Sequence, residues 1–169
     1  MSRLVRTFLY FGLIISQLAC YSVPHLIWPQ EDVVTREVKP NEVRSILIAA
    51  RRSEFKEMII NAIKINYQDD SVHIKIIGLD NLGLENPDHY QVIVLINTCM
   101  SWDMDRNVNS FLKKYSYQDN IIILTTSGDG SWLPKKKNRQ FDAVSSASII
   151  ADVDKISQEI ITKIDHLLN

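Results

Sequence analysis

The residues of this sequence that could carry chemistry follow short apolar segments that we predict to be strands. They are arginines that can bind an anion, hydroxyl and amide groups that can hydrogen-bond a ligand, a cysteine, and two tryptophans whose rings can stack on a planar group. If the strands are parallel, these residues gather at their carboxyl ends, where open α/β sheets bind ligands. The candidate ligand site comprises Arg51, Arg52, Ser53, Asn97, Thr98, Cys99, Trp102, Thr125, Thr126, Ser127 and Trp132.

The sequence contains no recognisable catalytic arrangement. Cys99 follows a predicted strand, but His73 and His166 are predicted on an edge strand and on the last helix, so neither stands at a recognisable spacing to act as its base. An inert thiol is therefore favoured over a nucleophile. No paired carboxylates point to a hydrolase or transferase, and no Cys/His spacing points to a metal. We expect a protein without catalytic residues or a metal ion, and a non-enzymatic role is favoured.

Length and composition are those of one globular domain. The chain has 169 residues, 46% of them hydrophobic and 23% charged. The formal net charge of −1 gives no electrostatic reason to bind nucleic acid. A basic cluster, 135–137 with Arg139, is interpreted either as a solvated loop or as a contact with anionic lipid or an acidic partner.

The N-terminal residues have the pattern of a membrane-targeting segment. Arg3 and Arg6 precede an apolar run at 8–15, which is shorter than the roughly 20 residues of a spanning helix. Ser16 and Gln17 follow the run, and then Leu18–Cys20, which resembles the end of a bacterial lipoprotein signal and implies lipidation of the cysteine. Gln17 stands where that motif usually has an aliphatic residue.

Four interpretations of this segment stay open: a lipid anchor on Cys20, cleaved secretion, an uncleaved anchor, and a cytosolic protein with an apolar first helix. We expect residues 1–20 to be a signal peptide or membrane anchor, and the protein to lie in a bacterial cell envelope, membrane-anchored on the periplasmic or extracytoplasmic side. Residues 21–43 contain three prolines and no clear period, which predicts a linker.

Residues 44–169 alternate between predicted strands and helices. Such alternation predicts an α/β fold, a three-layer, doubly wound, parallel sheet of five strands. The second strand alternates apolar and polar residues, which suits a sheet edge and favours the order 2-1-3-4-5. The predicted strands are 45–50, 72–79, 92–96, 121–124 and 141–145, and the helical stripes are Phe55, Met58, Ile59, Ala62 and Ile63, then Val108, Phe111, Leu112 and Tyr115, then Val153, Ile156, Ile160, Ile164 and Leu167.

The stretch from 44 to 168 resembles the flavodoxin-like fold. Tyr90–Leu95 is similar to that family's third strand, and Trp102 falls where many members carry an aromatic beside the flavin. Asn109–Tyr115 is similar to the helix that follows, and Ile121–Gly130 to the fourth strand and its loop. The resemblance implies that FMN is the cofactor to test.

The loop after the first predicted strand departs from that family. Flavodoxins hold the FMN phosphate there with closely spaced hydroxyl residues and a glycine. Here Ala49–Glu54 has one hydroxyl and no glycine, and Glu54 would repel a phosphate. Arg51 and Arg52 have three interpretations: solvated loop cations, an anion site, or substitutes for the usual phosphate ligands in a true FMN site. Solvated loop cations are favoured, so no cofactor is expected.

A second possible flavin signal is Asp142–Ser148. It resembles a motif through which some envelope proteins attach FMN covalently, and Ser148 would be the acceptor. Ser146 stands where the motif has glycine, so a strand end followed by a turn into the last helix is favoured.

The sequence therefore favours an envelope-tethered flavodoxin-like domain that acts as a non-catalytic binding or accessory module. Its expected partners are the membrane, through the N-terminal segment, and an unidentified protein or small ligand. The alternative is an FMN-dependent electron-transfer protein with an altered phosphate site.

Overall fold

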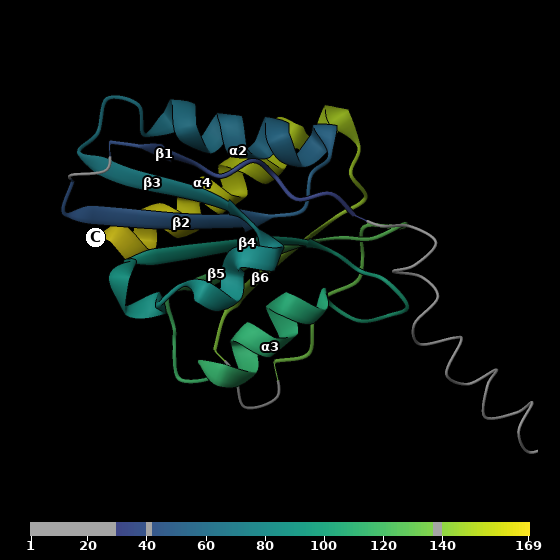
Figure 1. Cartoon of the computed structure of the whole chain (residues 1–169). Helices are drawn as coiled ribbons and strands as arrows, with labels where there is room; N and C mark the ends of the chain where they lie inside the picture. The colour runs from purple at the N-terminus through teal and green to yellow at the C-terminus, as the bar shows by residue number, and fades with distance from the viewer. Residues whose placement is uncertain (1–29, 40–41, 137–139) are drawn as a thin grey trace, which may run out of the picture. The chain divides into compact units, whose positions relative to one another are not determined.

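One mixed sheet of six strands organises the computed structural model, which describes residues 30–39, 42–136 and 140–169 (Figure 1). The strands lie in the order β1-β3-β2-β4-β5-β6. Their bounds are β1 Arg36–Val38, β2 Arg44–Ala50, β3 Val72–Gly78, β4 Val92–Thr98, β5 Ile121–Thr126 and β6 Asp142–Ser146.

The five parallel strands confirm the predicted order. Strand β2 pairs with β3 on one side and with β4 on the other, so that Ile48 lies between Ile76 and Val94. Strands β5 and β6 continue the sheet in the same direction. Strands β2, β4 and β5 are almost wholly buried, which explains why their sequences are continuously apolar.

The sixth strand, β1, corrects three expectations. It pairs antiparallel with β3, so β3 is not the sheet edge, and the sheet is mixed. The segment expected to be a linker at 21–43 therefore joins the domain from Glu31 onward. Its Val33 is buried, and β1 places Val38 opposite Ile74. A strand of three residues is too short to show a period in the sequence.

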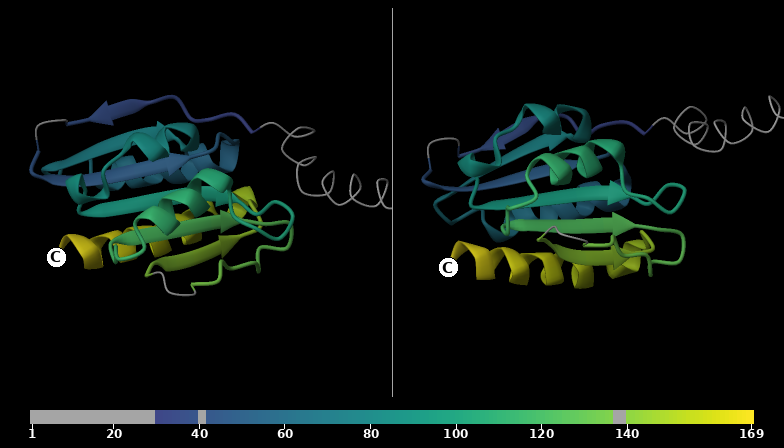
Figure 2. Two further views of the ribbon diagram at one scale, coloured as in Figure 1. Left: turned by 60° about the horizontal axis from the view of Figure 1, so that its bottom comes forward. Right: turned by 90° about the horizontal axis from the view of Figure 1, so that it is seen from below.

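Helices cover both faces of the sheet, which gives the predicted three layers (Figure 2). Helices α2, Glu54–Asn66, and α4, Val153–Leu168, pack together over one face. Helix α3, Arg106–Lys114, and the 3-10 helix η1, Leu79–Leu84, cover the other. Two shorter 3-10 helices, η2 Pro87–His89 and η3 Ile150–Asp152, lie in the connections.

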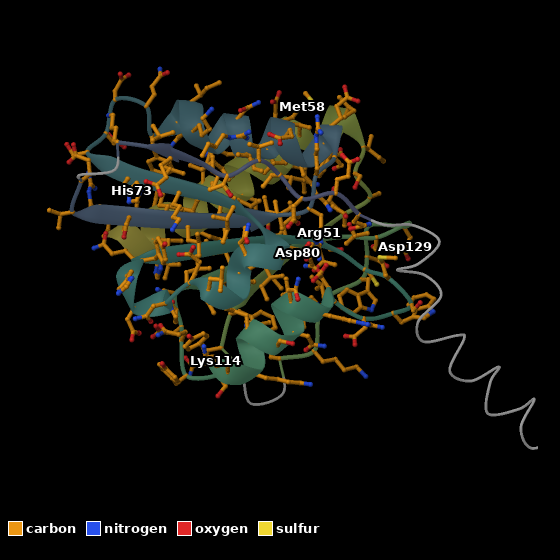
Figure 3. The ribbon with its side chains drawn as sticks, viewed as in Figure 1. Arg51, Met58, His73, Asp80, Lys114 and Asp129 are labelled. Carbon is orange, nitrogen blue, oxygen red and sulfur yellow. The ribbon has the colours of Figure 1, made fainter. Side chains whose placement is uncertain are left out.

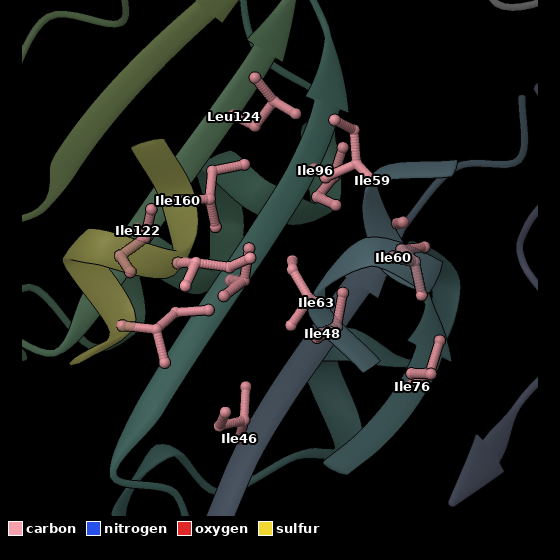
Figure 4. Close-up of a cluster of buried hydrophobic side chains, with 14 of the residues drawn as sticks. Ile46, Ile48, Ile59, Ile60, Ile63, Ile76, Ile96, Ile122, Leu124 and Ile160 are labelled. Carbon is pink, nitrogen blue, oxygen red and sulfur yellow. The ribbon is translucent and has the colours of Figure 1, made fainter. Parts of the chain in front are cut away.

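The larger core lies between the sheet and the pair α2 and α4. Isoleucines dominate it, and Figure 4 shows Ile48 and Ile96 of the sheet beside Ile59 and Ile63 of α2, with Ile160 contributed by α4. All five of these side chains are fully buried. Their close packing holds the strands in place, and the site loops follow the carboxyl ends of these strands.

The predicted helical stripe from Phe55 to Ile63 lies in helix α2, but the helix buries a rotated face. Ser53 caps it, and its hydroxyl accepts a hydrogen bond from the Lys56 backbone N–H. Met58, predicted on the buried face, lies on the outside of the molecule (Figure 3), whereas Ile60 and Lys56 are buried. The buried face therefore contains a charged side chain, and no apolar periodicity could reveal it.

The predicted targeting segment, with Cys20, lies outside the described residues. Among the residues that are described, no helix combines the length and the apolar character required to cross a bilayer.

Candidate functional site

Four loops follow the carboxyl ends of parallel strands, and the predicted site residues lie in these loops and in the last two residues of β4 and β5. The loop after β2 begins at Arg51, and the loop after β4 begins at Cys99. The loops after β5 and β6 begin at Ser127 and Ala147. Backbone hydrogen bonds join neighbouring loops, since Cys99 N–H donates to Thr126 O at 2.8 Å. The edge is therefore one continuous surface, as parallel pairing requires.

Arg51 is the centre of an ion-pair cluster at this edge (Figure 3). Its guanidinium lies 2.7 Å from Asp32, 2.9 Å from Asp80 and 2.9 Å from Asp105, and its side chain is only 11% exposed. Burial by itself lowers the pKa of Arg51, but the hydrogen bond and the charge of Asp105, together with Asp32 and Asp80, raise it above its ordinary value. Arg51 is therefore a permanent cation satisfied by three carboxylates of its own chain.

Asp105 links this cluster to helix α3. Its side chain caps the helix by accepting the Asn107 N–H at 2.8 Å, and it is almost fully buried. Its own N–H donates to Asn97 Oδ1 at 3.3 Å. The amide of Asn97 donates in turn to Thr125 Oγ1 at 3.1 Å. Asn97 and Thr125 are thus fully buried, and their hydrogen bonds connect β4, β5 and the start of α3. Their side chains are not exposed to a ligand.

Lys56 is a buried amine beneath the same edge. Its Nζ donates to Thr98 Oγ1 at 2.6 Å, and Thr126 Oγ1 lies 3.3 Å from that hydroxyl. The residue is 2% exposed. Burial lowers the pKa of Lys56 to about 8, which the charge of Asp105 opposes and the charge of Arg51 reinforces. The amine therefore titrates close to physiological pH.

Residues Glu31 and Asp32 lie against the loop after β2. The Asp32 carboxylate accepts hydrogen bonds from the N–H groups of Leu79 and Asp80, each at 2.9 Å, in addition to its contact with Arg51. Glu31 O accepts the Arg52 N–H at 2.6 Å. The groups that this loop could offer an anion are therefore bound to the chain itself.

Cys99 is in a setting that suppresses its reactivity. Burial raises the pKa of the Cys99 thiol, and the negative charges of Asp103 and Asp129 raise it further, against a backbone hydrogen bond at Trp102 that lowers it. A protonated thiol is the opposite of an activated nucleophile. The structure thus gives a physical reason to favour an inert Cys99.

Trp102 stands at the tip of a two-residue turn. Met100 and Asp103 exchange backbone hydrogen bonds of 3.0 and 3.1 Å, while Ser101 and Trp102 have φ of 52° and 61°. This turn favours Asn and Gly, and a tryptophan in it is strained. Even so, the Trp102 side chain is 83% exposed. The edge therefore presents a large apolar ring to solvent.

Trp132 has a different environment. It is half-buried and packs against the core on the α3 side. Its carbonyl accepts from Ser145 Oγ at 2.8 Å, and its N–H donates to Ser127 Oγ at 3.4 Å. Ser127 Oγ also contacts Asp129, whose pKa is lowered mainly by hydrogen bonds from Ser131. Trp132 and Ser127 therefore organise the loop after β5.

The structure brings some of the predicted residues together and separates others. Arg51 and Asn97 meet through Asp105, and Thr98 meets Thr126. Arg52 points to solvent and pairs with Glu31 at 3.4 Å, and Ser53 caps α2. The sequence reasoning missed four residues at this end of the sheet: Asp32, Lys56, Asp80 and Asp105. Of these, only Asp105 had a signal in the sequence, because an Asp directly before a helix is a typical N-cap.

The remaining sequence signals lie elsewhere. Asp142 is in β6, and Ser148 follows that strand in a left-handed conformation, with φ of 58°. Lys136 lies 5.7 Å from the Phe141 ring, while 137 and 139 of the basic cluster are outside the described residues. Across the described part of the chain, no group of three or more His, Cys, Asp or Glu side chains is placed to hold a metal ion.

Comparison with known proteins shows the fold. No protein-family model matches the sequence. No curated protein matches it either. Among solved structures, a flavodoxin from the domain Archaea has a TM-score of 0.53 at 9% identity, over 74% of this chain and 99% of that one. The metal-soaked Flv1 flavodiiron core from Synechocystis sp. PCC6803 has a TM-score of 0.52 at 8% identity, over 76% of this chain and 37% of that one. The chain thus spans little more than a third of the flavodiiron chain. The domain has the flavodoxin-like fold.

Proposed function

We propose that this chain is a non-catalytic flavodoxin-like binding module, whose carboxyl-end edge binds a partner protein or a small ligand other than FMN. One observation carries the proposal: the loop after β2 is bound by the chain's own Glu31 and Asp32. Arg51, the cation best placed to bind a phosphate, is already held by three carboxylates. The groups of this loop that could bind an anion are therefore engaged in contacts within the chain.

Electrostatics also oppose a phosphate at this loop. Asp80 is mostly exposed beside Arg51, and Glu54 lies in the first turn of α2. A phosphate dianion placed there would meet these carboxylates and Asp32 at short range, and repulsion between like charges is strong at a partly buried site. A neutral or monoanionic ligand does not meet this barrier.

Trp102 is the part of the edge that is available for binding. An exposed tryptophan in a strained turn is more costly than a polar residue there, and it offers a large contact area with few rotatable bonds. Tryptophan is also enriched among the residues that dominate protein interfaces. We therefore assign partner contact to the loop after β4.

The test is a titration of the purified protein with FMN and with riboflavin, followed by flavin fluorescence and by the absorbance of the protein as isolated. We expect a colourless protein and no saturable binding of either flavin in the micromolar range. Riboflavin is the matched control because it lacks the phosphate. A yellow protein, or FMN binding at least about tenfold tighter than riboflavin, would overturn the proposal, since the difference would require a working phosphate site.

An FMN-dependent electron carrier is the second candidate, and the exposed ring of Trp102 favours it, because an aromatic at this loop could stack on an isoalloxazine. In that case Trp102→Ala weakens the binding of FMN and riboflavin equally, whereas Arg52→Ala weakens FMN alone. The absence of both effects would exclude this candidate.

We further propose that the module is tethered to the bacterial envelope through its N-terminal segment, with Cys20 as the lipid acceptor. The support is the sequence pattern of Arg3, Arg6 and Leu18–Cys20. Mass spectrometry of the mature N-terminus in a bacterial host tests it, with Cys20→Ser as the control. Residues before Cys20 still attached to the mature protein would remove the lipoprotein assignment.

A further inference from the structure

The segment Glu31–Val38, named here the strap, runs from beside the loop after β2 to the outer strand β1 (Figure 1). Its last residues form β1 and pair with β3 through Arg36 and Val38. Its first residues reach the loop after β2, where Asp32 forms a bridge with Arg51. One short segment therefore spans from the outer strand to the candidate site.

Polar contacts hold the site end of the strap. The Asp32 carboxylate receives the Arg51 guanidinium at 2.7 Å and the N–H groups of Leu79 and Asp80 at 2.9 Å each. No room is left at the neighbouring glycine, because a Cβ on Gly78 would lie 2.3 Å from Asp32 Cγ. The carboxylate therefore sits in a fitted site formed by one cation, two backbone donors and a residue without a side chain.

Apolar contacts of the strap are few. Val33 is buried, but Val34 is 70% exposed, and Val38 is only partly buried against the core. Segments with little buried apolar surface open at a lower free energy than the core they cover. Release of the strap is therefore expected to occur without unfolding the sheet.

In the native arrangement one carboxylate, that of Asp32, occupies the position that the strap vacates. Arg51 and Lys56 are the cations of the cluster, and Asp80 and Asp105 are its anions once Asp32 is withdrawn. Without Asp32 these four charges sum to zero, and with it the native sum is −1. A single carboxylate restores that native sum, whereas a phosphate dianion exceeds it by one negative charge. The β3 edge next to the site offers backbone hydrogen bonds to an added strand.

We propose that the strap is an intramolecular ligand of a carboxylate-binding site, and that an extended acidic segment of a partner protein replaces it there. The partner's carboxylate takes the place of Asp32, and its backbone pairs with β3 as β1 does. The inference rests on the proposed function only in placing partner binding at this edge. Its tests involve no flavin, so its failure is distinguishable from the failure of the proposed function.

The first test measures hydrogen exchange in the full chain. Strap amides, such as the Val33 N–H bonded to Ala50 O, should exchange faster than core amides of β2 and β4. Asp32→Ala should speed strap exchange by about tenfold to a hundredfold, the range for losing hydrogen bonds to a charged group, and leave core exchange nearly unchanged. Glu31→Ala is the matched control, because its pair with Arg52 is exposed, and it should change strap exchange by less than about fivefold.

The second test measures binding of a labelled peptide with the sequence of residues 30–39 to the full-length Asp32→Lys variant, whose own strap is repelled by Arg51. The peptide should bind at least about tenfold more tightly than the same peptide with alanine for Asp32. Wild-type protein should bind it more weakly, because its tethered strap competes at high effective concentration. Asp32→Ala serves as a second host for the peptide, and the unfolding transition of each variant confirms that it is folded.

Two results would overturn the proposal. Strap amides as protected as core amides would show that the strap opens only with global unfolding. Equal affinity for the two peptides in both variants would show that the site does not recognise the carboxylate.

Discussion

Lys56 allows a quantitative test of the charge arrangement beneath the site. Its amine is buried and donates a hydrogen bond to Thr98 Oγ1. Burial disfavours the positive charge, and the charge of Asp105 offsets only part of that effect. We consider the substitution Lys56→Met, which keeps a flexible side chain of similar length and removes the charge.

The magnitude follows from the two states of the amine. The pKa of Lys56 is about 8 in the folded protein, against an ordinary value of 10.5. Between these values the unfolded chain binds more protons than the folded one, so the free energy of unfolding rises with pH. The full rise corresponds to roughly 3 kcal/mol at about 1.4 kcal/mol for each pH unit. The destabilisation caused by burying the charged amine is therefore complete below about pH 8 and disappears above about pH 10.5.

The assay is urea unfolding of wild type and Lys56→Met at several pH values from 7 to 10.5. The difference between the two proteins is the useful quantity, because burial raises the pKa of Tyr67 and Tyr90, which lowers stability at high pH in both. We expect this difference to shift by roughly 3 kcal/mol in favour of wild type across the range. Lys64→Met, on the same helix, is the control and should give a difference that varies by less than about 0.5 kcal/mol. A flat difference for Lys56→Met would show that the amine is solvated, and the buried arrangement would be refuted.

Three further substitutions test the site geometry. Arg51→Met should lower the free energy of unfolding by about 3–5 kcal/mol because it leaves the buried carboxylate of Asp105 and the partly buried one of Asp32 without a cation. Arg52→Met, in an exposed pair, should change it by less than about 1 kcal/mol; urea unfolding measures both. Gly78→Ala should cost about 1–3 kcal/mol, and the loss should shrink in an Asp32→Gly background, which removes Asp32 Cβ as well as the carboxylate; a double-mutant cycle would show it. Trp102→Gly should raise the free energy of unfolding by about 1 kcal/mol, because glycine adopts the left-handed backbone conformation of this position without strain; thermal unfolding measures it. An unchanged or lower stability would argue against strain in that turn.

The fold was predictable because its signals are local and repeated. Strands β2, β4 and β5 are buried on both faces, so their sequences are continuously apolar, and the stripe of α4 from Val153 to Ile164 recurs over several turns. Alternation of such elements restricts the topology to few possibilities. Strand β1 escaped because three residues with partly exposed side chains carry no period.

The cluster at the site was not predictable in the same way. Arg51 stands out in the sequence, but its partners Asp32 and Asp105 lie 19 and 54 positions away, and only the strand order brings them together. Lys56 occupies a helix position that an apolar stripe would assign to solvent. Loop composition thus identified the edge, while the use of its cations depended on tertiary contacts.

The way Arg51 joins three backbone segments leads to a final prediction. Its guanidinium contacts Asp32 in the strap, Asp80 in η1 and Asp105 at the start of α3. Hydrophobic replacement of a buried ion pair is often neutral for stability, so stabilisation alone does not explain such a cluster, whereas joining segments does. Arg51→Met should therefore speed hydrogen exchange in all three segments, including the Asn107 N–H bonded to Asp105, while Asp32→Ala should speed it mainly in the strap. If Arg51→Met affects only one segment, the guanidinium is a local contact and does not join the three segments.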